Sequence, residues 1–133
     1  MGLFGPPKEF RERTFTMPCS RAEALEVISS SSDLDGNSPF GILGSGPVSG
    51  PPLMEAIYVE SMNDDGFVIA AGNRVRTLWR MRMTLTGDNP TSGTFGALEV
   101  NDQRWFGNVM GAVFALDKAV RSVGGRRGKW PTG

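Results

Sequence analysis

Residues 74–86 read Arg74-Val-Arg-Thr-Leu-Trp-Arg-Met-Arg-Met-Thr-Leu-Thr86, and this stretch decides the fold class. Its apolar residues of one parity are Val75, Trp79, Met81, Met83 and Leu85, and the arginines of the other parity are Arg74, Arg76, Arg80 and Arg82. An alternation with a period of two residues is typical of a β-strand with one buried and one solvated face. The stretch therefore predicts an antiparallel sheet whose apolar face is covered by another layer.

Further strands are expected on both sides of this stretch. Turn formers at Asn63-Asp-Asp-Gly66 predict a hairpin, in which the glycine adopts a positive φ. Other turns are expected at 72–73 and 87–93. The strands themselves are predicted at 10–17, 53–61, 67–71, 74–86 and 94–100, with a short additional one at 40–43. Together they predict an antiparallel meander of about five to six strands.

Two helices are predicted, one short and one long. Ser20-Arg-Ala-Glu23 is a capping-box pattern, and the helix that it begins is expected to end in the serines at 29–32. The second helix is expected to begin at Asn101 or Asp102 and to end near Val123, before two glycines. Its wide apolar stripe is suited to packing on the sheet. The fold class is therefore α+β, with the sheet packed against a long C-terminal helix.

Length and turn content suggest the domain organisation. A chain of 133 residues is typical of a single domain, here 1–133. Residues 1–8 and 125–133 are expected to be flexible. Residues 33–52 are rich in Gly, Ser and Pro, which indicates either a long connecting loop or a flap over a pocket.

Composition excludes several classes of function. The formal net charge is zero, which argues against general attraction to nucleic acid or anionic membranes. Without histidine, the chain has neither a Ser-His-Asp or Cys-His catalytic site nor the usual zinc site. The single cysteine indicates a reducing compartment, so a cytoplasmic location is expected. No apolar run is long enough to span a bilayer, and no secretory signal is expected at the start.

No residue pattern predicts catalysis, a cofactor or a metal site. Asp33 and Asp35 lack the ligand spacing of a calcium loop, and Asp64-Asp65 are explained by a hairpin turn. Tyr58 is a candidate proton donor or a half-buried strand residue. Cys19 precedes a helix, so either its thiolate is favoured by the helix dipole or its side chain packs against Ala24. An enzyme is therefore less expected than a binding protein.

The arginines of residues 74–86 have two interpretations. They can form the solvated outer face of the sheet, paired across strands with carboxylates such as Glu55, Glu60 or Glu99. Alternatively, they can bind an anion or nucleic acid together with the basic tail. Nucleic acid is the less favoured partner because no aromatic residues alternate with the arginines.

The apolar face opposite the arginines predicts a site for a hydrophobic small molecule. Methionine and aromatic side chains adapt to varied apolar ligands. The same residues can instead form an ordinary core. The candidate ligand-binding residues between the sheet and the long helix are Trp79, Met81, Met83, Leu98, Phe106, Met110 and Phe114.

Small residues recur every four positions on the long helix at Gly107, Gly111, Ala115 and Ala119. A glycine inside a helix costs about 1 kcal/mol relative to alanine, so the ridge suggests close approach of another backbone. That backbone can belong to a second copy of the chain or to a loop of the same chain. The alternative function is accordingly a non-enzymatic module that homodimerises through this ridge, at Gly107, Gly111 and Ala115, or through a sheet edge.

The order of elements resembles the helix-grip fold of the START-like superfamily, also called SRPBCC, which includes polyketide cyclase-like proteins. The resemblance is best at Phe15-Thr-Met-Pro-Cys-Ser-Arg-Ala-Glu-Ala-Leu-Glu-Val-Ile28 and at the final helix, Trp105 to Val123. It implies binding of a hydrophobic small molecule between the sheet and the helix. Family members usually have a second helix where this chain has the Gly/Ser/Pro-rich stretch, and no catalytic motif of theirs matches residues of this sequence.

Overall fold

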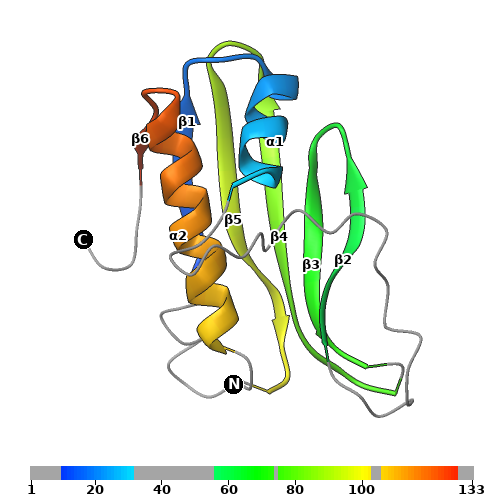
Figure 1. The fold of residues 1–133 in the computed structure, drawn as a ribbon. Helices are drawn as coiled ribbons and strands as arrows, with labels where there is room; N and C mark the ends of the chain where they lie inside the picture. The colour runs from blue at the N-terminus through cyan, green and yellow to red at the C-terminus, as the bar shows by residue number, and fades with distance from the viewer. Residues whose placement is uncertain (1–9, 32–55, 74, 103–105, 129–133) are drawn as a thin grey trace.

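The computed structural model describes residues 10–31, 56–73, 75–102 and 106–128. The fold is α+β, as predicted: an antiparallel sheet carries both helices on one face (Figure 1). The strands are β1 (Arg13–Met17), β2 (Ala56–Asn63), β3 (Gly66–Gly72), β4 (Thr77–Gly87), β5 (Thr91–Val100) and β6 (Arg126–Arg127), and the helices are α1 (Arg21–Ser29) and α2 (Phe106–Ser122). The predicted strand at 40–43, the loop or flap at 33–52 and the flexible start at 1–8 lie outside the described residues.

The sheet has six strands in the order β2-β3-β4-β5-β1-β6. Strands β2 to β5 are consecutive neighbours, which confirms the predicted meander, and β1 pairs antiparallel with both β5 and β6. Strand β6 lies in the tail that was expected to be flexible. Its pairing with Phe15 and Thr16, and the bond from the Gly128 N–H to the Thr14 carbonyl, hold residues 126–128 on the sheet.

Three β-bulges shift the alternation of faces along the sheet. The extra residue is Glu60 in β2, Leu78 in β4 and Leu98 in β5. Each bulge places two residues of one strand opposite one residue of its neighbour. Sequence periodicity did not reveal any of them.

Val75 differs from the prediction that it shares the buried face with Trp79. Strand β4 begins at Thr77, and Val75 lies in the turn before it with 72% of its surface exposed. The turn is held by Asn73, whose Oδ1 accepts hydrogen bonds from the N–H groups of Val75 (2.8 Å) and Arg76 (2.9 Å). This local hydrogen bonding competes with strand geometry.

Helix α1 begins as the sequence predicts. Ser20 Oγ accepts a hydrogen bond from the Glu23 N–H at 3.2 Å, which is the first half of the capping box. A second bond was not predicted: Asp88 Oδ1, in the turn between β4 and β5, accepts from the Arg21 N–H at 2.8 Å. At the other end, the Ser29 and Ser30 hydroxyls donate to the Glu26 carbonyl, so the helix ends within the serine run.

The core lies between the helices and the face of the sheet that carries Trp79. Trp79 and Phe10 meet edge to face, with ring centroids 5.9 Å apart. The fully buried side chains contributed by the sheet and by the long helix are Phe15, Met17, Ile69, Trp79, Met81, Met83, Leu85, Phe95, Val109, Ala112, Leu116 and Val120. We call this helix-covered side the inner face and the opposite side the outer face.

Candidate functional site

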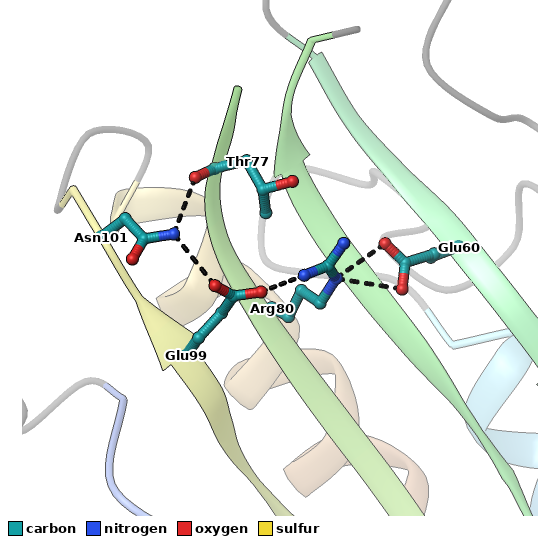
Figure 2. Close-up of polar contacts among 5 residues, drawn as sticks. All are labelled: Glu60, Thr77, Arg80, Glu99 and Asn101. Atoms are coloured by element: carbon teal, nitrogen blue, oxygen red, sulfur yellow. Dashed lines mark hydrogen bonds and ion pairs between the residues drawn. The ribbon is translucent and has the colours of Figure 1, made fainter. Parts of the chain in front are cut away.

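The outer face is organised around Arg80. Its Nε donates to both carboxylate oxygens of Glu60, at 3.0 and 2.8 Å, and its Nη1 donates to Glu99 (Figure 2). Asn101 Nδ2 in turn donates to the other Glu99 oxygen and to the Thr77 carbonyl, each at 3.0 Å. These contacts confirm the interpretation of Arg80 as a cross-strand ion-pair residue, with the two predicted partners Glu60 and Glu99. We call Glu60, Arg80 and Glu99 the Arg80 network.

One bulge and one small residue make the network possible. The bulge at Leu98 brings Glu99 to the side of the sheet that carries Arg80. Glu60 lies on that side by ordinary alternation, because Tyr58, two residues earlier, pairs with Ala70. Strand β3 separates β2 from β4, and its residue opposite Arg80 is Ala70. A methyl group leaves room for the long arginine side chain to cross β3 and reach Glu60.

The pKa of Arg80 is raised by its two carboxylate partners. The hydrogen bond to Glu60 raises the pKa of Arg80 above its usual range, against the lowering effect of burial, and the bond to Glu99 raises it further. The guanidinium therefore stays protonated and neutralises part of the two carboxylates. An arginine already engaged in this way is not available as an anion-binding group.

The other arginines of residues 74–86 are arranged differently. Arg76 pairs with Asp102 at 3.0 Å, whereas Arg82 forms no ion pair with a described residue and lines a hollow on the outer face with Thr84 and Thr94. Arg74 and Glu55 lie outside the described residues. The three described arginines thus do not act as one cationic patch.

The Arg80 network is expected to contribute modestly to stability. A double-mutant cycle with Arg80→Met and Glu99→Gln should give a coupling energy of about 0.5–1 kcal/mol, since the side chains are only about one-third exposed. Urea denaturation at low and high salt measures it, and salt should reduce it. The control cycle Arg21→Met with Asp65→Asn, whose side chains are 41% and 65% exposed, should give under about 0.3 kcal/mol. Equal couplings in both cycles would contradict the assignment.

Two candidate reactive groups of the described chain are not activated. Burial, and then the charge of Glu60, raise the pKa of Tyr58, while Arg80 lowers it less. Burial, and then the charge of Glu23, raise the pKa of the Cys19 thiol. Both groups stay protonated at neutral pH, so the thiolate expected from the helix dipole does not form. Cys19 is a buried residue of the core cluster.

The predicted ligand-binding residues separate into two groups. Trp79, Met81 and Met83 lie together on the inner face, each with at most 1% of its surface exposed, and pack in the core with α2. Met110 is half-buried on α2, and the side chain of Phe106 is not described. The inner face therefore brings Trp79, Met81 and Met83 together, as expected.

Leu98 and Phe114 lie elsewhere than predicted. Leu98 is 46% exposed because it has the parity of Gly96, which lies opposite Arg82 on the outer face, and it lines the outer-face hollow with Arg82. Phe114 is 45% exposed, while its neighbours Val113 and Ala115 on α2 are buried. Neither side chain contributes to the space between sheet and helix.

The small-residue ridge of α2 is covered by the chain itself at one position. Ala115 has no exposed surface, and its carbonyl accepts a hydrogen bond from Ser31 Oγ at 2.7 Å. Ser31, two residues beyond the end of α1, therefore contacts α2 at Ala115 from within the same chain. The loop at 33–52, which was the candidate for such a contact, lies outside the described residues. Gly111 is partly exposed, and the surroundings of Gly107 are not described.

A groove lies between α1 and the hairpin that joins β2 to β3. Its volume is about 550 Å³, and the residues that line it are Arg21, Ala22, Leu25, Glu26, Ser29, Met62, Asp64 and Asp88. We call it the α1 groove. The α1 residues form one helix face, since they follow an i, i+1, i+4, i+5, i+8 spacing. Leu25 and Met62 are partly buried hydrophobic residues packed against the core.

Polar contacts fix one end of the α1 groove. Arg21 Nη1 donates to Asp65 Oδ1 at 2.9 Å, which ties the start of α1 to the tip of the β2–β3 hairpin. The Asp88 bond to the Arg21 N–H ties the same residue to the turn between β4 and β5. The sequence did not reveal this site because its walls are 33–67 residues apart along the chain and only the fold brings them together.

Comparisons with known proteins identify no relatives. No protein-family model matches the chain, and no curated protein or solved structure is significantly similar to it. In the described part of the chain, no helix is long and apolar enough to cross a membrane. Nor do the described residues bring three potential metal ligands together.

Proposed function

We propose that this chain is a non-catalytic protein that binds a hydrophobic small molecule in the α1 groove. The observation that carries the proposal is that three apolar residues, Ala22, Leu25 and Met62, line a groove of about 550 Å³. Pockets for small molecules commonly enclose 300–1,000 Å³ and are lined mostly by apolar groups with a few polar ones. The groove therefore has the size of a small-molecule site, and its lining combines these three apolar residues with five polar or charged ones.

The ligand class is the one expected from the sequence, and the proposed location differs. The inner-face residues Trp79, Met81 and Met83 have almost no exposed surface and pack with residues of α2 such as Val113 and Leu116. A ligand there has to displace close-packed side chains, which is costly. The α1 groove is already open, so a ligand needs no such displacement.

The groove also has an adaptable wall. Met62 is unbranched and flexible, and such side chains adjust to ligands of different shape. It projects from the inner face of β2, opposite Phe67 of β3, and is only partly buried. A ligand that covers Met62 and Leu25 gains about 0.8 kcal/mol for each methylene that it buries.

The state of Cys19 favours binding over catalysis. Burial raises the pKa of the Cys19 thiol, so this potential nucleophile stays protonated at neutral pH.

Blocking the groove is expected to weaken binding of the neutral dye Nile red by about tenfold. Ala22→Trp places a large ring on the exposed wall of the groove. The ring should reduce the apolar burial of the dye by the equivalent of about two methylenes, which corresponds to a roughly tenfold weaker dissociation constant. Fluorescence titration measures the dissociation constant. The wild type should bind the dye saturably with one site per chain.

Two matched variants serve as controls for this titration. Glu23→Trp introduces the same ring on α1 at an exposed position that does not line the groove, so its affinity should match the wild type. Phe114→Ser removes the exposed aromatic side chain of α2. This variant tests the alternative explanation that the dye binds where two copies of the chain associate through Phe114. Equal affinity of wild type and Ala22→Trp, or loss of binding in Phe114→Ser alone, would refute the proposed site.

A further inference from the structure

We infer that the molecule bound in the α1 groove is amphipathic and carries a cationic group, such as a primary ammonium, beside its apolar body. This inference rests on the proposed function and specifies its ligand class. It follows from the charges that line the groove, from what those charges already contact, and from the volume available.

The charged residues that line the groove are unbalanced. Three carboxylates, Glu26, Asp64 and Asp88, face a single guanidinium, that of Arg21. Arg21 is already paired with Asp65 at 2.9 Å. Within the described residues, no Lys or Arg side chain forms an ion pair with Glu26, Asp64 or Asp88. The groove therefore keeps a surplus of negative charge that a ligand can neutralise.

The carboxylates belong to both walls of the groove. Glu26 lies on α1 one turn beyond Ala22, and Asp64 lies two residues beyond Met62 at the tip of the hairpin. Each wall thus combines an apolar residue with a carboxylate. A ligand with an apolar body and a cationic end matches both walls.

An anionic ligand is disfavoured at the one position that usually attracts it. The start of a helix binds anions through its free N–H groups. At α1 two of these groups are already used, because Asp88 Oδ1 accepts from the Arg21 N–H and Ser20 Oγ accepts from the Glu23 N–H. A ligand carboxylate there would be repelled by the negative charge of Asp88.

A metal ion fits the groove less well than an organic cation. The described residues do not bring three His, Cys, Asp or Glu side chains close enough to hold one ion. Carboxylates spread over a groove of about 550 Å³ instead suit an extended molecule. The apolar residues that line the groove would stabilise an organic ligand but not a bare ion.

Competition against bound Nile red with three eight-carbon compounds tests the inference. Octylamine, which is an ammonium at pH 7, should displace the dye at about fivefold lower concentration than 1-octanol, and octanoate should be the weakest competitor. In the double variant Glu26→Gln/Asp64→Asn, the advantage of the amine should fall below about twofold. Neither substitution removes a described side-chain contact.

The control variant Glu12→Gln/Glu23→Gln changes the net charge equally at exposed positions that do not line the groove, so it should keep the amine preference. Equal potency of amine and alcohol, a stronger effect of octanoate, or loss of the preference in the control variant would overturn the inference while leaving apolar binding intact. Absence of saturable dye binding would instead remove the proposed function.

Discussion

Replacement of Trp79 by alanine is expected to lower the free energy of unfolding by about 3–5 kcal/mol. The Trp79 side chain has no exposed surface, lies between Ala71 of β3 and Val100 of β5, and meets the Phe10 ring edge to face at 5.9 Å. Its removal forfeits apolar burial and leaves a cavity that the close-packed surroundings cannot fill. Urea denaturation measures the change, and thermal unfolding should shift downward by roughly 10–20 °C.

Val75→Ala is the matched control for this substitution. Val75 has the same parity as Trp79 in the sequence but is 72% exposed in the turn before β4, so its truncation should change stability by less than about 0.5 kcal/mol. Similar costs for the two substitutions would mean that both side chains lie on the buried face, as periodicity alone suggests. A cost below about 1 kcal/mol for Trp79→Ala would contradict the described core.

Gly66→Ala is expected to destabilise the protein by at least about 2 kcal/mol. Gly66 has a φ of +143°, and a Cβ at this position would lie 1.9 Å from the Met83 carbonyl oxygen. Both backbone strain and a collision with β4 therefore oppose any side chain. The Leu85 N–H, which bonds to the Asp65 carbonyl at 2.7 Å, is part of the same junction. Chemical denaturation measures the loss.

Gly124→Ala separates the effect of backbone strain from that of the collision. Gly124 also has a positive φ, +77°, but a Cβ there meets nothing within 4 Å. Its substitution should cost only about 1 kcal/mol, the typical penalty for a non-glycine residue in the left-handed region. If Gly66→Ala costs no more than Gly124→Ala, close packing of the hairpin against β4 is not what excludes a side chain at Gly66.

Several elements were predictable because they depend on residues close together in the sequence. Ser20 caps α1 through a bond to a residue only three positions away. The Asn63–Gly66 turn needs only a residue that tolerates a positive φ, and Gly66 adopts a φ of +143°. The alternation around Trp79 and Met81 requires only that one side of a strand be buried. Such short-range requirements can be recognised from the sequence alone.

The bulges were not predictable from periodicity. A bulge adds one residue to one strand and depends on how that strand pairs with its neighbour. Alternation from Phe95 and Ala97 would place Glu99 on the inner face, and the bulge at Leu98 instead brings it beside Arg80. The register between strands is a property of the folded sheet.

By itself, the sequence determined the fold class, the antiparallel meander, the ends of α1 and the apolar face that forms the core. Only the tertiary structure decided which arginine is paired, which apolar residues are exposed and where a groove opens. Arg80 reaches Glu60 across a neighbouring strand, and the α1 groove joins Leu25 to Met62 from separate elements. The physical reason is that burial patterns follow from local periodicity, whereas ion pairs and grooves depend on strand register and on the distance between elements far apart in the chain.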